Sequence, residues 1–160
     1  MSAQPPLYFY RQHEKPYGVF SNFYLAPITL NSLTWPTTEH YFQAQKFPTR
    51  PDLQLQIQQA ESPGKAARLG RNKSFPLRSD WERIKDSVMK ECLIAKFTQY
   101  PEFRDLLLGT EDRILVEHTA NDRYWADGGD GTGKNMLGIL LMEIRNEFRA
   151  ADSAERHTSR

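Results

Sequence analysis

The sequence contains a single cysteine, Cys92, and therefore forms neither an internal disulfide nor a cysteine zinc site. Cys92 falls within an amphipathic pattern, where a packed apolar side chain is expected rather than a nucleophile. The four histidines are not spaced as metal ligands, so we predict no bound metal ion and no cofactor. The longest apolar run, Ile139-Leu140-Leu141-Met142, is far too short to span a membrane.

An excess of charge of either sign is missing as well. The net charge is +1, so any contact with nucleic acid has to be local, because no overall basic field attracts phosphate. The first residues do not combine a basic segment with an apolar run, which argues against a signal peptide. The lone cysteine fits a reducing compartment. We therefore predict a cytoplasmic protein without a membrane segment.

The apolar residues recur mainly at the spacing of three and four that is typical of helices. Helices are expected at 36–47, at 53–60 after a cap at Asp52, at 63–70 after a cap at Ser62, from 81 until Pro101 after a cap at Asp80, at 103–108 and at 136–148. Short strands are expected at 7–10 and 114–118, with a hairpin over 25–34 that turns at Asn31-Ser32. The sequence thus predicts an α+β fold, a predominantly helical single domain with a small sheet of short strands. Its expected parts are a disordered leader at 1–6, the domain at 7–149 and a frayed C-terminal tail at 150–160.

The stretch from Trp35 to Phe47 combines an acid, an amide, a lysine and several aromatic residues. A proline and two threonines are typical of a helix start, because proline fits the first turn and a threonine oxygen can cap a free amide. On such a helix Glu39 and Lys46 lie within about 20° of each other around the axis, with Gln43 between them. A surface salt bridge explains this row at little cost, and a catalytic row is the functional alternative. His40 lies off the row and is expected in the core.

A second candidate is the glycine-rich segment from Asp127 to Asn135. Its glycine spacing matches a P-loop, but Asn135 stands where a serine or threonine would hold magnesium, so we do not expect nucleotide hydrolysis. Nor does the segment have the alternating oxygen ligands of a calcium loop. Glycine amides before a helix can hold a phosphate or carboxylate, although a tight surface turn explains the glycines equally well. Trp125 suits stacking on a base or sugar, or a place in the core.

Several blocks of this sequence resemble the signature of the NADAR (YbiA-like) N-glycosidases. The blocks are Ser21-Asn22-Phe23, 35–47, Ser62-Pro63 with 66–71, and 125–138. The resemblance covers nearly the whole chain, from residue 8 to residue 148. One departure is Ala126, where many relatives carry glycine, and we expect it to alter the shape of the loop.

The resemblance implies hydrolysis of the bond between C1 of a phosphorylated ribose and an exocyclic amine. Family members are associated with ribosylaminopyrimidine intermediates of riboflavin synthesis and with the removal of ADP-ribose from guanine bases. The implied ligand is therefore of ADP-ribose or ribose-5-phosphate type, with ADP-ribosylated nucleic acid as a further partner, and no prediction of oligomeric state follows. The alternative is a non-catalytic module that binds ADP-ribose or a nucleotide, which only a turnover assay distinguishes. A helical interaction domain ranks last, because the helices offer no surplus apolar stripe.

On this sequence the resemblance, together with the residue chemistry, places catalysis at Glu39, Lys46 and Asp127. Glu39 is expected to activate water or to stabilise a developing oxocarbenium ion. Lys46 is expected to pair with the charge of Glu39, to donate to a ribose oxygen or to attack an opened imine. Asp127 is a second carboxylate, as paired acid and base roles in glycosidic cleavage require. The expected substrate-binding residues are Asn22, Phe23, Gln43, Arg71, Trp125, Gly128, Gly129, Gly131, Gly133, Lys134 and Asn135. We expect the row and the glycine loop to line one ribose-phosphate pocket.

Overall fold

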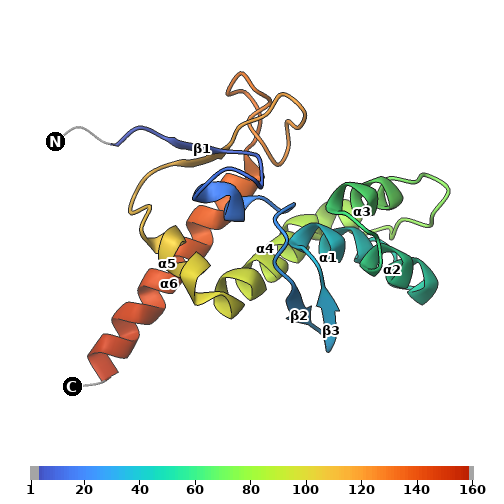
Figure 1. The fold of residues 1–160 in the computed structure, drawn as a ribbon, viewed down its shortest axis with the longest axis horizontal. Coiled ribbons are helices and arrows are strands. Elements are labelled where there is room, and N and C mark those ends of the chain that lie inside the picture. Colours follow the sequence, from blue (N-terminus) through green and yellow to red (C-terminus); the bar gives the residue numbers. More distant parts are fainter. Residues whose placement is uncertain (1–3, 159–160) are drawn as a thin grey trace. The chain divides into compact units, whose positions relative to one another are not determined.

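A computed structural model describes residues 4–158 of the chain (Figure 1). The predicted leader at 1–6 therefore lies partly outside the described residues. Helices and short strands follow one another as β1 Leu7–Phe9, the 3-10 helix η1 Tyr17–Phe20, β2 Ile28–Leu30, β3 Leu33–Trp35, α1 Thr38–Ala44, α2 Pro51–Gln58, α3 Pro63–Gly70, α4 Trp81–Gln99, α5 Pro101–Leu108, β4 Leu115–Glu117 and α6 Met136–Thr158. The predicted α+β class is confirmed. Within the described residues no helix has the length and apolar character to cross a membrane.

The chain divides into two compact units. The central unit is continuous and consists of Asn22–Gln99. The terminal unit combines Met1–Ser21 with Tyr100–Arg160. The domain limits predicted at 7 and 149 stay a prediction.

The central unit is built around α1. Its hairpin pairs β2 with β3 in antiparallel register, and Asn31 and Ser32 both have positive φ, 54° and 66°, as a two-residue turn of this kind requires. This confirms the predicted turn. α1 packs against α2, α3 and α4 (Figure 1), so most of its side chains are buried whatever their direction. The apolar residues of this unit that are 0% exposed are Ile28, Ala44, Ile57, Ala66, Cys92, Leu93 and Phe97.

Capping decides where the first helices begin. Thr37 accepts a hydrogen bond from the amide of His40 at 3.2 Å and caps α1, so Pro36 precedes the cap rather than occupying the first turn. Ser62 caps α3 in the same way, as predicted. The predicted cap at Asp52 is wrong, because α2 begins at Pro51 and the Asp52 carboxylate forms two hydrogen bonds with Arg50, at 2.8 and 2.9 Å.

His40 is a core histidine, as predicted. Its side chain is 1% exposed, and Nε2 lies 3.0 Å from the carbonyl of Ala60 while Nδ1 lies 2.8 Å from Thr37 Oγ1. A carbonyl only accepts, so Nε2 donates to it and Nδ1 accepts from the threonine hydroxyl. Burial lowers the pKa of His40, although the bond to Ala60 opposes that effect, and the ring therefore favours the neutral form.

The terminal unit joins two distant segments through a parallel pair of strands. β1 pairs with β4, with Leu7 opposite Leu115. The helix predicted to end near Phe148 continues to Thr158, so residues 150–158 extend α6 instead of fraying. This extension has a physical cause, because its alanines, glutamate and arginine favour helix and Arg104 of α5 forms an ion pair with Asp152 at 2.6 Å.

Candidate active site

The predicted row lies on α1 and just beyond its end. Gln43 Nε2 donates to Glu39 Oε1 at 2.7 Å, so the amide fixes the direction of the carboxylate. Lys46 follows the C-cap of α1, and its Nζ donates to the carbonyl oxygen of Gly70 at 3.2 Å. Lys46 Nζ thus contacts a backbone carbonyl of α3, and the salt bridge and the catalytic row both stay predictions for the row. Glu39 and Lys46 are both half-buried, and Gln43 is buried.

Several nearby groups act on the Lys46 amine. Burial lowers its pKa most strongly, the negative charge of Glu39 opposes that effect, and the positive charge of Arg71 adds to it. The Nζ atom also lies 5.7 Å from the centre of the Trp81 ring. The net lowering of the Lys46 pKa increases the fraction of neutral amine, which is the nucleophilic form.

Asn22 is placed at the start of α1. Its side-chain oxygen accepts from Thr38 Oγ1 at 2.8 Å, and its backbone carbonyl accepts from the amide of Glu39 at 3.3 Å. Asn22 is buried, and Phe23 beside it is half-buried. Arg71 follows α3, where its Nε donates to the carbonyl of Ala67 at 3.2 Å and the residue remains exposed. The central unit therefore brings Asn22 and Arg71 to the two ends of the row.

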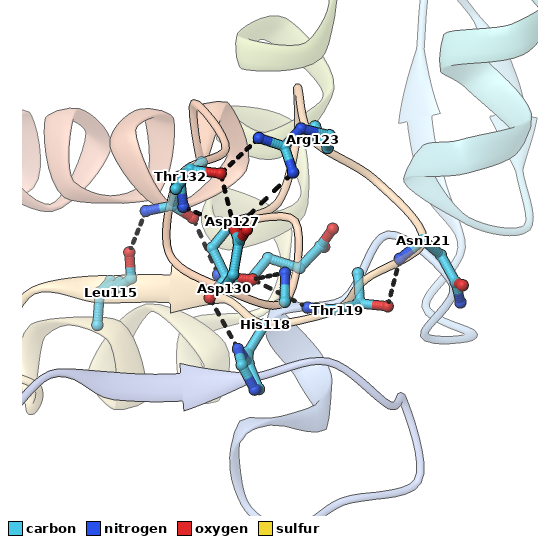
Figure 2. A network of polar contacts seen from close by, with 11 residues as sticks. Leu115, His118, Thr119, Asn121, Arg123, Asp127, Asp130 and Thr132 are labelled. Carbon is cyan, nitrogen blue, oxygen red and sulfur yellow. Dashed lines mark hydrogen bonds and ion pairs between the residues drawn. The ribbon is translucent and has the colours of Figure 1, made fainter.

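Asp127 organises the glycine loop of the terminal unit. Its Oδ2 lies 2.7 Å from His118 Nδ1, and its Oδ1 accepts from the amides of Gly129 at 2.8 Å and Thr119 at 3.2 Å (Figure 2). Burial raises the pKa of Asp127, but the hydrogen bonds from His118 and the two amides outweigh it and leave the pKa below its usual value. An ionised carboxylate only accepts, so His118 Nδ1 carries the proton and donates.

His118 is a residue that the sequence reasoning missed. It follows β4, its amide donates to the carbonyl of Phe9 at 2.8 Å, and its ring meets Tyr8 edge-on with centres 5.3 Å apart. The only signal in the sequence is a histidine at the end of a strong strand pattern. Nothing in that signal indicates which carboxylate the ring contacts.

The glycine amides are largely engaged within the loop itself. Gly128, Gly129 and Gly131 have φ values of 75°, 83° and 86°, which side-chain-bearing residues rarely adopt. The amide of Gly128 donates to the carbonyl of Asp122, that of Gly129 to the Asp127 carboxylate, and that of Gly133 to the Asp127 carbonyl. In the outer part of the loop, Arg123 Nη1 lies 3.8 Å from Asp130 Oδ1 and forms an ion pair with it (Figure 2). This geometry favours a tight surface turn over a loop whose amides bind a phosphate or carboxylate.

The remaining predicted binding residues surround the start of α6. Asn135 uses both ends of its amide on β4, where Oδ1 accepts from the amide of Glu117 and Nδ2 donates to the carbonyl of Leu115, each at 2.9 Å. Lys134 Nζ lies 5.2 Å from the centre of the Tyr124 ring. The half-buried Trp125 meets that same ring edge-on, with centres 4.9 Å apart.

The predicted site residues thus form two groups, one in each unit. The central unit holds Asn22, Phe23, Glu39, Gln43, Lys46 and Arg71, and the terminal unit holds Trp125, Asp127, Gly128, Gly129, Gly131, Gly133, Lys134 and Asn135. That the two groups serve one ligand stays a prediction.

Comparison with known proteins places this chain among related sequences. The model of the NADAR domain matches residues 8–149. N-glycosidase YbiA of Shigella flexneri serotype 5b (strain 8401) is 56% identical over 132 residues, which cover 82% of this chain and 82% of that protein. Riboflavin biosynthesis protein VVA0006 of Vibrio vulnificus (strain YJ016) is 41% identical over 148 residues, 91% of this chain but 39% of that protein. The NMR structure of the E. coli protein YbiA superimposes with a TM-score of 0.86 at 49% identity, covering 95% of this chain and 89% of that one.

Proposed function

Since the chain belongs to the NADAR domain family, we propose that it is an N-glycosidase that cleaves the bond between C1 of a phosphorylated ribose and an exocyclic amine. One observation carries the proposal to particular residues. The Glu39 carboxylate is held by the Gln43 amide at 2.7 Å, in the same row as Lys46, an amine whose pKa burial lowers. A fixed base and an available nucleophile are what such a cleavage requires.

Lys46 acts as the nucleophile in this proposal. A ribosylamine with an exocyclic nitrogen can open to an imine, and the neutral Lys46 amine adds to its C1. Both protons of the Lys46 amine pass to the exocyclic nitrogen, whose bond to C1 breaks. The base therefore leaves as a free amine, and Lys46 remains joined to C1 as a new imine. Burial and the charge of Arg71 favour the neutral amine that this step needs.

Glu39 completes the reaction. Its carboxylate takes a proton from a water molecule, and that water forms the bond from oxygen to C1. Collapse of the adduct passes the proton from Glu39 and the proton of the new hydroxyl to the Lys46 nitrogen and breaks the bond between that nitrogen and C1. The ribose is released with C1 as an aldehyde, which closes to the ring form. The start of α1 favours the ionised form of Glu39, because the positive end of the helix dipole lies there.

The substrate class follows from the shared chemistry of two candidates. Removal of ADP-ribose from ADP-ribosylated guanine, in nucleosides or nucleic acid, is the first, and hydrolysis of ribosylaminopyrimidine phosphates of riboflavin synthesis is the second. Both carry an exocyclic amine on C1 of a 5-phosphorylated ribose. The name of the Vibrio vulnificus relative, a riboflavin biosynthesis protein, supports the second candidate. The match covers 39% of that protein, so this support comes from one part of it.

A turnover assay tests the proposal. The protein is incubated separately with ADP-ribosylated guanosine and with a ribosylaminopyrimidine 5-phosphate, and free ADP-ribose or ribose 5-phosphate is measured by chromatography. We expect catalytic release from at least one of them, with many turnovers per protein molecule. Saturable binding of ADP-ribose without release from either substrate would instead identify a non-catalytic binding module.

A further inference from the structure

We infer that Gly70, the last residue of α3, is a positioning residue that holds both ends of the row on α1. The bare Cα of Gly70 leaves the space that Gln43 needs to hold Glu39, and its carbonyl oxygen holds Lys46. This inference rests on the proposed function, because it concerns how the proposed base and nucleophile are oriented.

The first part concerns the space beside Gly70. A Cβ atom at this position would lie 1.9 Å from Gln43 Oε1, 2.7 Å from its Cδ and 2.9 Å from its Cβ. The Gln43 amide therefore occupies the volume that any other residue would need for its side chain. Gly70 is buried and Gln43 is 5% exposed, so neither can move aside into solvent.

The Gln43 amide faces Glu39 with its donor and Gly70 with its acceptor. Its Oε1 lies against Gly70 and accepts no hydrogen bond from any described residue, while Nε2 donates to Glu39. A buried acceptor without a partner is unfavourable, and a weak contact with the Cα hydrogen of Gly70 relieves it only in part. Turning the amide over would place Oε1 against the Glu39 carboxylate, where two acceptors repel each other. The Glu39 carboxylate therefore selects the direction of the Gln43 amide, and the missing side chain of Gly70 provides the space in which that orientation fits.

The second part concerns the carbonyl of Gly70. The last carbonyl groups of a helix have no partner within the helix, and the negative end of the helix dipole favours a cation there. Lys46 Nζ donates to this carbonyl at 3.2 Å. One residue of α3 therefore fixes the amine directly and the carboxylate through Gln43.

A helix-stop role does not explain this glycine. The glycines with positive φ in the described residues are Gly128, Gly129 and Gly131, so Gly70 has a backbone conformation that other residues also adopt. Gly64 in the same helix provides a comparison, because a Cβ there would meet only Ser62 Oγ, at 3.9 Å. The requirement at position 70 is space for Gln43, and position 64 has no such requirement.

The test compares Gly70→Ala with the matched control Gly64→Ala. We expect Gly70→Ala to lower kcat about 10- to 100-fold with KM changed less than about 3-fold, because misplacing a reacting group by an ångström has effects of this size. Gly64→Ala should stay within about 2-fold of the wild type. A Gly70→Ala protein with wild-type kcat would overturn the inference.

A double-mutant cycle separates positioning from general damage. If Gly70 acts through Gln43, then Gly70→Ala lowers kcat strongly in the wild type but less than about 3-fold in a Gln43→Ala background. The double variant also removes the two closest contacts, at 1.9 and 2.7 Å, and keeps only the one to the Cβ atom at 2.9 Å, so we expect it to be more stable than Gly70→Ala alone. Equal losses in both backgrounds would overturn the inference.

A spectroscopic readout keeps this test independent of turnover. In 15N-labelled protein the side-chain amide resonances of Gln43 should shift in Gly70→Ala and stay in place in Gly64→Ala. Unchanged Gln43 resonances in Gly70→Ala contradict the positioning role. A wild type without turnover contradicts the proposed function instead, and the Gln43 resonances still decide the role of Gly70.

Discussion

The neutral amine of Lys46 makes the pH dependence of catalysis predictable. Burial lowers the pKa of Lys46, and a nucleophile reacts as the free amine, so kcat should rise with pH through that lowered pKa and then level off. A pH–rate profile between pH 5 and 9 measures this.

Lys46→Arg should abolish turnover, because arginine keeps the charge but forms no imine. Borohydride should trap a covalent adduct in the wild type only. A profile that falls over the same range, with an active Lys46→Arg variant, would show that Lys46 acts through its charge.

Asp127 is predicted from the sequence as a second carboxylate, and its contacts favour an anchor of the loop. Asp127→Asn replaces an oxygen that accepts from His118 by a donor, and we expect a loss of about 1–3 kcal/mol of stability. Thermal unfolding at pH 7 measures it. In the wild type this contribution is present above the unfolded-state pKa of Asp127 and is lost as pH falls through its lowered folded-state pKa. A large loss of kcat in a variant that unfolds like the wild type would restore the catalytic role.

The two candidate groups differ in how far the sequence could define them. The order Glu39, Gln43, Lys46 follows from helix geometry, and the structure shows a hydrogen bond between Gln43 and Glu39 that the spacing alone did not specify. The partner of Lys46 could not be predicted, because Gly70 lies on another helix and lacks a side chain that would draw attention to it. For the same reason His118 and Asp127 were not paired, since nothing local relates the end of a strand to a distant loop residue.

At the level of elements, Asn135 joins β4 to the start of α6. Both ends of its amide bond to the backbone of β4, so Asn135→Ala should lower the melting temperature by roughly 3–10 °C through the loss of two partly buried hydrogen bonds. KM should change less than about 3-fold, because this side chain is engaged within the fold. Calorimetry and steady-state kinetics on the same variant measure both. A raised KM with an unchanged melting temperature would instead support the predicted role in substrate binding.

Helix and strand limits were predictable where local chemistry decides them. Ser62 and Thr37 cap their helices because the hydroxyl reaches an amide three residues ahead, and Asn31-Ser32 adopts the turn of its hairpin. The prediction fails at Asp52, where an arginine two residues earlier competes for the carboxylate. It also fails at the end of α6, because polarity alone does not end a helix that contacts α5 through Asp152.

For the molecule as a whole, Lys96 links pH to stability. It lies on α4, is 1% exposed, and burial lowers its pKa to about 7. The unfolded chain binds this proton up to its ordinary pKa of about 10.4, so unfolding takes up a proton and stability rises with pH above 7. We expect the free energy of unfolding of the wild type to increase by about 1–2 kcal/mol between pH 7 and 8.5, as urea titrations measure.

Lys96→Met should remove this increase, because methionine does not titrate. The exposed Lys73 offers a matched control, and Lys73→Met should keep the wild-type slope. Equal slopes in all three proteins would show that Lys96 keeps its charge at neutral pH.

The class and family of the molecule were predictable, and its division into two units was not. Long signature blocks identify the family, and helical spacing indicates the α+β class. The terminal unit depends on β1 pairing with β4, segments that lie far apart in the sequence. Short strands carry too little pattern to specify a partner.

The kcat of Glu39→Gln is the measurement that decides whether the row on α1 is catalytic. Glutamine keeps the size of the side chain and an oxygen that accepts from Gln43, so the variant should fold like the wild type. Glu102→Gln, at an exposed acid in the first turn of α5, is the matched control. We predict that Glu39→Gln lowers kcat by about 100-fold or more while Glu102→Gln stays within about 2-fold of the wild type. Hydrolysis by Glu39→Gln at a rate near that of the wild type would contradict the proposed role of Glu39.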